Sequence, residues 1–206
     1  MMSHQTVIVL DFGGQYNQLI ARRVRECRVY CEVKPYTTPI AELKAMDPIG
    51  IIFTGGPNSV YLDDSPHVDS DIFTWGVPIL GICYGCQLMA HALGGQVTEA
   101  QDDSAREYGK TQTSYDTACK LFHGLPAQGI SWMSHGDYMA KVPEGFALVA
   151  HSDACPNVAI ADETRGFYGV QFHPEVNHSE NGVAMIRNFL YEVCGAKGDW
   201  TMEDYK

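Results

Sequence analysis

Residues 77–95 read VPILGICYGCQLMAHALGG and join a short apolar run to a helical run through a cysteine that lies between two glycines. We predict a strand over Val77–Ile82 and a helix over Tyr84–Leu93, which Gly94 and Gly95 end. A buried strand that turns directly into a helix is a repeating unit of α/β proteins. The sequence on either side is therefore expected to contain further units of this kind.

The sequence before residue 77 alternates strand-like and helix-like segments. Thr6–Leu10 and Gly50–Phe53 are short, apolar and rich in β-branched residues, as in strands that are buried on both faces. A helix is expected over residues 15–28, a second strand over Val29–Pro35 and a short helical turn over Ile40–Ala45. Alternation of this kind predicts a parallel sheet with helices on both faces.

From residue 96 onward the pattern changes to shorter strands with glycine and proline turns, which favours antiparallel pairing. A closing amphipathic helix is expected over Val183–Val193. We therefore predict an α/β fold with an open, mostly parallel, twisted sheet, helices on both faces and a small antiparallel extension. The strands expected in this half are Val97, Thr111–Ser114, Ile130–Trp132, Ala147–His151, Val158–Ile160 and Phe167–Phe172.

Length and charge limit the classes of protein that the sequence can encode. The chain has 206 residues, which favours one large domain with a sizeable core. Its 14 basic and 25 acidic side chains give a net charge of −11, which argues against binding nucleic acid or an anionic membrane surface. Hydrophobic residues make up 45% and charged residues 19%, a balance that excludes a wholly disordered chain.

Cysteine usage and the N-terminal residues indicate the compartment. Seven scattered cysteines, an odd number, argue against a disulfide framework. The N-terminal residues lack the basic and then apolar layout of a signal peptide, and no apolar run approaches the roughly 20 residues that span a bilayer. We therefore expect a reducing, cytoplasmic location and no membrane partner.

Cys83 lies at the centre of a glycine-x-nucleophile-x-glycine pattern, with Gly81 and Gly85 on either side. In this pattern a strand turns sharply into a helix, and side chains at the flanking positions would crowd the turn. The N-terminus of the following helix also favours a thiolate. An isolated cysteine is more often a buried core residue, but this context favours a nucleophile.

A second interpretation uses the same residues. Cys83 and Cys86 form a Cys-x-x-Cys pair, which in other proteins is a redox site or half of a zinc site. The redox pair usually belongs to the first strand-helix unit of a thioredoxin-like fold, whereas here it follows the fourth strand. The spacing of the other candidate ligands does not complete a zinc site; these are Cys27, Cys31, His173 and His178.

A cysteine nucleophile needs a base, and His173-Pro174-Glu175 offers one at the end of a predicted strand. A residue before proline is held extended, and alternate residues of extended chain point the same way. His173 and Glu175 are therefore expected to face one site, as a base and the carboxylate that orients it.

Residues 134–137 (SHGD) also include residue types that are common in catalytic sites. Neighbours on one loop seldom form a triad, so a loop that contacts substrate is expected there.

Together these stretches resemble the class I glutamine amidotransferases, a family with a flavodoxin-like fold, and the resemblance covers nearly the whole chain. Within the family the sequence looks most like the amidotransferase domain of the GMP synthases. The stretches that resemble the family are Gly81–Gln87 (GICYGCQ), Tyr168–Val176 (YGVQFHPEV) and Thr54–Pro57 (TGGP). Those that resemble the GMP synthases are Asp11–Glu26, Arg106–Lys110 and Trp132–Asp137.

The resemblance implies a chemistry for these residues. Cys83 would attack the side-chain amide of L-glutamine, His173 would carry the proton and Glu175 would hold the imidazole. The backbone N–H groups of Gly56 and Tyr84 would form the oxyanion hole. The positions that match the glutamine pocket of the family are Gln87, Ser134, His135 and Asp137, of which Asp137 is a partner for the α-ammonium group.

The resemblance also implies a division of the chain. Residues 1–196 would be the amidotransferase domain, and residues 197–206 the start of a linker to an ATP-pyrophosphatase (synthetase) domain. Ammonia would pass to that domain for amination of XMP to GMP, and ATP and magnesium are expected there only, so no cofactor or metal is expected in this chain. Ser179 stands where threonine is frequent in the family, and it is not expected to touch the triad.

Two alternatives stay open at this point. The chain could be a class I amidotransferase that serves another synthase, of the anthranilate or carbamoyl phosphate type. It could also have a non-enzymatic role, as a redox Cys-x-x-Cys protein or a regulatory pseudo-enzyme.

Overall fold

The computed structural model describes the chain apart from residues 1–3, 63, 100–106, 136, 154 and 202–206. Its strands are β1 (Thr6–Asp11), β2 (Tyr30–Pro35), β3 (Gly50–Phe53), β4 (Ile79–Ile82), β5 (Gln96–Glu99), β6 (Glu107–Tyr115), β7 (Gln128–His135), β8 (Asp137–Lys141), β9 (Ala147–Ser152), β10 (Ala159–Asp162) and β11 (Phe167–Val170). Its helices are α1 (Asn17–Glu26), α2 (Ile40–Ala45), α3 (Tyr84–Ala92), α4 (Gly182–Asn188), the short 3₁₀ helices η1 (Ser70–Phe73) and η3 (Lys120–Phe122), and the π-helical η4 (Phe189–Val193).

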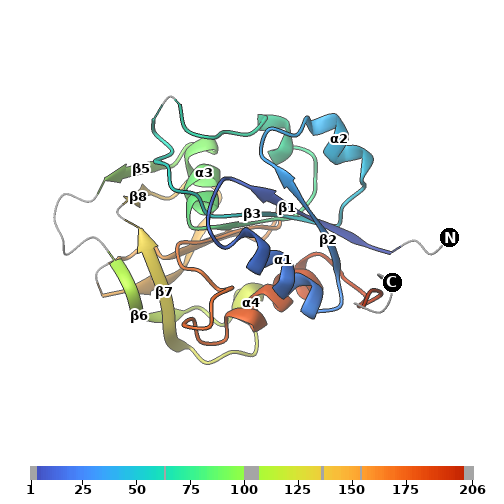
Figure 1. Ribbon diagram of the computed structural model, residues 1–206. Helices are drawn as coiled ribbons and strands as arrows, with labels where there is room; N and C mark the ends of the chain where they lie inside the picture. The colour runs from blue at the N-terminus through green and yellow to red at the C-terminus, as the bar shows by residue number, and fades with distance from the viewer. Residues whose placement is uncertain (1–3, 63, 100–106, 136, 154, 202–206) are drawn as a thin grey trace.

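A nine-stranded sheet with the order β2-β1-β3-β4-β11-β10-β9-β6-β7 forms the centre of the molecule (Figure 1). The first five strands in this order are parallel, and the last four continue the same sheet in antiparallel pairing. Strands β5 and β8 pair separately as a two-stranded antiparallel sheet. The predicted fold class is therefore confirmed, with an antiparallel extension of four strands in the main sheet.

Helices cover both faces of the sheet, as the alternation of strands and helices predicted (Figure 1). Helices α1 and α4 lie on one face and helices α2 and α3 on the other. Each pair closes its own apolar core: Ile20, Val24 and Ile186 belong to one, and Leu43 and Leu88 to the other. Strands β1, β3 and β4 are buried along nearly their whole length because both of their faces are covered.

Helix α1 is shorter than predicted, since it spans Asn17–Glu26 rather than residues 15–28. At its start, the Asp11 carboxylate accepts hydrogen bonds from the Gly13 N–H at 2.7 Å and from the Asn17 amide, which holds the preceding residues in a loop. At its end, Arg28 adopts a left-handed conformation with φ of 65°. Because the helix begins only at Asn17, the residues before it form a loop, and this loop is a wall of the site described below.

Strand β8 was not predicted, because residues 134–137 were expected to be a loop. Strand β7 instead ends at His135 and β8 begins at Asp137. The pairing of β8 with β5 brings Val97 opposite Met139, and both side chains are buried. Such a strand depends on a distant partner, and local β-propensity does not reveal it.

The parallel half of the sheet determines where a ligand can bind. Strand β1 lies between β2 and β3, so the strand order reverses at β1: the chain passes to β2 on one side and then to β3 on the other. In open α/β sheets, the crevice at the carboxyl ends of such strands is the usual binding site. The loops that follow β1, β3, β4 and β11 meet there. Among the described residues, none of the helices has the length and apolar composition needed to cross a membrane.

Candidate active site

Cys83 occupies a strained turn between β4 and α3. Its backbone has φ of 54° and ψ of −109°, a conformation that residues with a side chain rarely adopt. Strain of this kind costs on the order of 1–3 kcal/mol and persists only where the surroundings impose it. The Cys83 N–H donates to the Val170 carbonyl at 2.8 Å, which fastens the turn to strand β11.

The two glycines beside Cys83 are required by close contacts. A Cβ atom on Gly81 would lie 2.7 Å from the Gly85 carbonyl oxygen and 2.8 Å from the Cys86 nitrogen. A Cβ atom on Gly85 would lie 2.5 Å from both the Cβ atom and the carbonyl oxygen of Phe53. The strand-turn-helix geometry that the glycine pattern predicted is therefore present, for the steric reason expected.

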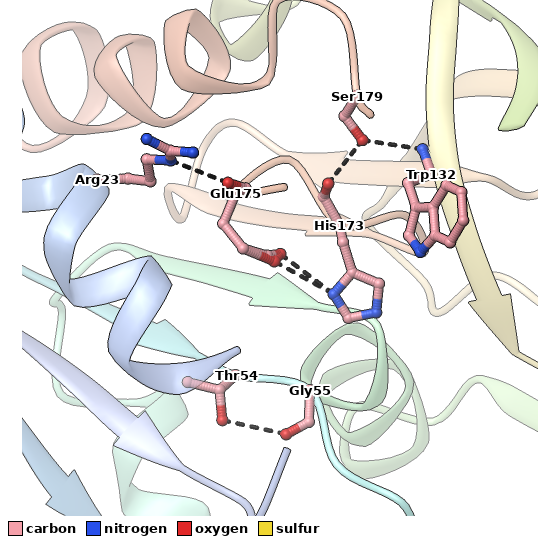
Figure 2. Close-up of polar contacts among 7 residues, drawn as sticks. All are labelled: Arg23, Thr54, Gly55, Trp132, His173, Glu175 and Ser179. Atoms are coloured by element: carbon pink, nitrogen blue, oxygen red, sulfur yellow. Dashed lines mark hydrogen bonds and ion pairs between the residues drawn. The ribbon is translucent and has the colours of Figure 1, made fainter. Parts of the chain in front are cut away.

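His173 and Glu175 face each other across Pro174, as the extended geometry of this segment predicted. The His173 Nδ1 atom lies 3.1 Å and 3.2 Å from the two carboxylate oxygens of Glu175 (Figure 2). Glu175 is fully buried, and His173 is 7% exposed. The Cys83 side chain also interacts with the imidazole, and the Tyr16 ring packs edge-on against it at 5.4 Å.

Two opposing effects set the protonation of His173. Burial lowers the pKa of the imidazole, but the hydrogen bonds and charges of Cys83 and Glu175 outweigh burial and raise the pKa of His173 to about 10. The raised pKa favours transfer of a proton from the Cys83 thiol to the imidazole. When the sulfur of Cys83 bonds to a substrate it loses the charge that raises this pKa, and the imidazolium then becomes a better proton donor to a leaving group.

We predict that the ring carbon signals of His173, followed by NMR, titrate near pH 10 rather than at the ordinary pKa of 6.5. Because the folded-state pKa is raised, the imidazolium stabilises the fold fully below about pH 6.5, and this contribution is lost as the pH rises through about 10. The Glu175→Gln substitution should lower the His173 pKa. A titration of His173 near 6.5 in the unsubstituted chain would contradict the paired arrangement.

A cavity of about 360 Å³ opens beside Cys83 and His173. This volume lies at the lower end of the range for ligand pockets, roughly 300–1,000 Å³, and fits a small metabolite. The loops after β1 and β3, the start of α3 and Asp137 of β8 contribute to its walls. The cavity therefore collects residues from distant parts of the sequence around the sulfur of Cys83.

The expected oxyanion donors, Gly56 and Tyr84, both line this cavity. Tyr84 is the first residue of α3, so its N–H has no acceptor within the helix. The buried Thr54 holds the loop that carries Gly56: its hydroxyl accepts from the Phe12 N–H at 3.0 Å and donates to the Gly55 carbonyl at 3.2 Å (Figure 2). Preorganised N–H groups of this kind are suited to hold a developing oxyanion.

Two of the four expected substrate contacts, Gln87 and Asp137, line the cavity. The Gln87 amide donates to the Gln171 side-chain oxygen at 3.0 Å. The Asp137 carboxylate accepts from the Ser59 hydroxyl at 2.7 Å and from the Tyr61 hydroxyl at 3.1 Å. The side chains of the other two expected contacts, Ser134 and His135, lie outside the described part of the structure.

The sequence did not point to two groups of residues that the structure adds to the cavity. Residues 13–16, in the loop after β1, line one wall, and Ser59 and its neighbours line another. The signal for the first group was their place after a buried parallel strand, since such loops form the crevice in α/β sheets. Ser59 carries no local signal.

Ser179 also differs from expectation, since it does contact the triad. Its hydroxyl donates to the His173 carbonyl at 2.6 Å and accepts from the Trp132 N–H at 2.9 Å (Figure 2). The prediction was wrong because the contact depends on a turn that the residue pattern does not reveal: the chain turns back after Val176, and this brings Ser179 beside the backbone of His173.

The two cysteines of the Cys-x-x-Cys pair lie in different surroundings. Cys83 borders the cavity, whereas Cys86 is fully buried in the core beneath α2 and α3, where its sulfur lies 3.9 Å from that of Met139. Burial raises the pKa of the Cys86 thiol well above its usual range. All seven cysteines are within the described residues and none forms a disulfide. Nor does the described part of the chain gather three or more side chains that could hold a metal ion.

A cysteine on a strained strand-to-helix turn, beside an imidazole and a buried carboxylate, places the chain among α/β enzymes with a cysteine nucleophile. The family model for class-I glutamine amidotransferases matches residues 8–193. The chain belongs to the class I glutamine amidotransferases.

Curated relatives of high identity carry one name. GMP synthase [glutamine-hydrolyzing] of Clostridium perfringens is 58% identical over 199 residues, which are 97% of this chain and 38% of the relative. The enzyme of the same name from Caldicellulosiruptor saccharolyticus is 56% identical over 204 residues, 99% of this chain and 39% of the relative. The chain thus spans less than two fifths of the length of these relatives.

Solved structures show the same fold. A Thermoplasma acidophilum protein assigned to the GMP synthases superposes with a TM-score of 0.80 and 31% identity, over 94% of this chain and 96% of that one. A glutamine amidotransferase from Thermotoga maritima superposes with a TM-score of 0.74 over 95% of this chain and all of the other, at 16% identity. The second likeness concerns the fold alone.

Proposed function

We propose that this chain hydrolyses L-glutamine to glutamate and ammonia and is the glutaminase part of a GMP synthase. The observation that carries the proposal is the contact of Cys83, on its strained turn, with the His173–Glu175 pair beside a cavity of metabolite size. Membership of the class I glutamine amidotransferases supports glutamine as the substrate. The high identity to GMP synthases supports the more specific assignment.

In the proposed reaction the Cys83 sulfur attacks the side-chain amide carbon of glutamine, and the thiol proton passes to His173. The N–H groups of Gly56 and Tyr84 hold the resulting oxyanion. His173 then gives its proton to the departing ammonia, which leaves a glutamyl thioester on Cys83. A water molecule attacks the thioester, His173 accepts its proton and returns it to sulfur, and glutamate is released. Glu175 holds the imidazole in position throughout.

The remaining contacts of the substrate follow from the polarity of the cavity. Asp137 is a carboxylate on the cavity wall, and we assign it to the α-ammonium group of glutamine. Gln87 is held by Gln171 and would contact the substrate from the α3 side, with Ser134 and His135 as further contacts by analogy with the family.

We predict that Asp137→Asn raises the KM for glutamine by roughly 10–100-fold, as expected for the loss of a charge-assisted hydrogen bond worth about 1.5–3 kcal/mol. The effect should be small for glutaramate, which lacks the α-amino group and cannot use the carboxylate. Steady-state kinetics with the two substrates measures the difference. Asp153→Asn, at an exposed position, is the matched control. Equal losses for both substrates would remove the assignment of Asp137.

The ammonia would serve the amination of XMP to GMP in a synthetase domain, where ATP and magnesium would bind. Support comes from the length of the curated relatives, of which this chain spans 38–39%. Mixing the chain with the synthetase part of a relative should give glutamine-dependent GMP from XMP. Failure to do so, with glutaminase activity intact, would favour an amidotransferase of the anthranilate or carbamoyl phosphate type.

We also place the reaction in the cytoplasm. The seven cysteines are all thiols, most of them buried, which agrees with a reducing compartment.

The primary test of the proposed function is glutamate release by the chain. A glutamine-analogue electrophile labels the nucleophile, and mass spectrometry locates the adduct. The adduct is expected on Cys83, and an adduct on another cysteine would overturn the site.

A further inference from the structure

Strand β7 holds both backbone polar groups of His173. The His173 N–H donates directly to the Trp132 carbonyl at 2.9 Å. The His173 carbonyl accepts from the Ser179 hydroxyl at 2.6 Å, and that hydroxyl accepts from the Trp132 N–H at 2.9 Å. Ser179 therefore completes a closed link between one residue of β7 and one residue of the triad, and it is itself 7% exposed.

Helix α1 holds the same segment from the other direction (Figure 2). The Arg23 Nε donates to the Glu175 carbonyl at 2.9 Å, and a terminal nitrogen of Arg23 donates to the Asn177 side-chain oxygen at 2.8 Å. The remaining guanidinium nitrogen pairs with Glu26 at 3.0 Å. The Arg23 side chain is 14% exposed, so most of it is withdrawn from solvent to reach this backbone.

The position of the imidazole relative to Cys83 depends on this backbone. His173 and Glu175 are already joined to each other through their side chains, so the pair moves as a unit. Cys83 is carried by a different element and is fastened to the Val170 carbonyl. The contacts that hold the segment from 173 to 179 therefore set the distance between the imidazole and the sulfur.

We propose that Ser179 and Arg23 are positioning residues, which hold the backbone of His173 and Glu175 from opposite sides and so keep the imidazole aligned with Cys83. Neither side chain lines the cavity, so both would act through the triad rather than on the substrate. The kinetic part of this inference rests on the proposed glutaminase function. A misplacement of about 1 Å at a reacting group can cost on the order of 10²-fold in rate.

The test uses Ser179→Ala and Arg23→Gln in the full chain, with two comparison variants. Ser179→Thr keeps the hydroxyl and should restore the contacts of Ser179. Arg22→Gln removes the same charge from an exposed neighbouring position of α1. Steady-state glutamate release, the rate of Cys83 alkylation by iodoacetamide and the NMR titration of His173 are measured for each, at a temperature where melting curves show every variant folded.

We expect Ser179→Ala and Arg23→Gln each to lower kcat by roughly 10–100-fold, with KM changed by less than about threefold. Both should also lower the His173 pKa, because the imidazole moves away from Cys83, which raises that pKa. Ser179→Thr and Arg22→Gln should resemble the unsubstituted chain. Loss of thermal stability alone, with kcat and the His173 titration unchanged, would overturn the proposal.

Failure of the glutaminase assignment is separable from failure of this inference. If the unsubstituted chain released no glutamate, the proposed function would fail, but the His173 titration and the Cys83 alkylation rate would still report alignment. Unchanged titration and alkylation in both variants would then reject the positioning role. A lowered His173 pKa that Ser179→Thr avoids would support it.

Discussion

Replacing Cys83 with alanine is expected to abolish glutamate release, with a loss of turnover on the order of 10⁶-fold. The substitution removes the sulfur atom that would form the proposed thioester, and neither His173 nor the backbone donors of the cavity could replace it. The fold should survive, because backbone contacts such as the N–H bond to Val170 hold the turn. Glutamate formation, together with labelling by the glutamine-analogue electrophile, measures the loss.

The matched control is Cys86→Ala, which changes the cysteine three residues after Cys83, in helix α3. Cys86 is fully buried among apolar side chains and borders no part of the cavity. This variant should keep its glutaminase activity and lose some stability, because it leaves a small void in the core. If Cys83→Ala retained full turnover, the nucleophile assignment would be wrong. If both variants lost activity equally, the Cys-x-x-Cys interpretation would regain support.

The parts of the site that sequence predicted are those whose geometry is local. The turn spans the five residues that contain Gly81, Cys83 and Gly85. The two glycines indicate that the turn has no room for a Cβ atom at these positions. His173 and Glu175 are two residues apart in extended chain, so their alignment follows from backbone geometry and from the proline between them. The parallel half of the sheet was predictable for a similar reason, because buried parallel strands are continuous apolar runs.

The residues that escaped prediction act across long separations in sequence. Arg23 reaches the Glu175 carbonyl over 152 residues, and Ser59 reaches Asp137 over 78. Neither residue signals its contact in the sequence, because an arginine on a helix is usually solvated and a serine in a loop has no characteristic partner. The same reasoning applies to β8, whose strand exists because β5 pairs with it.

The second large effect is expected from Gly85→Ala, which tests whether the turn demands glycine. Intrinsic helix propensity favours alanine over glycine by about 1 kcal/mol. Against this, the new Cβ would lie 2.5 Å from the Cβ and carbonyl oxygen of Phe53 and 2.8 Å from its carbonyl carbon. Two of these three atoms belong to backbone at the end of buried strand β3, which cannot move aside as a flexible side chain could. We therefore expect the clash to win.

The net destabilisation should be about 3 kcal/mol, at the upper end of the usual cost of overpacking. For a chain of this size that corresponds to a fall in Tm of roughly 6–12 °C. Gly129→Ala is the control, because its Cβ would meet nothing nearer than 3.6 Å and its backbone needs no positive φ. Calorimetry of both variants should separate them clearly. A Gly85→Ala chain as stable as the control would show that α3 can shift away from β3. The conformation of the turn at Cys83 would then depend on its contact with β11 and not on the close packing of Gly85 against Phe53.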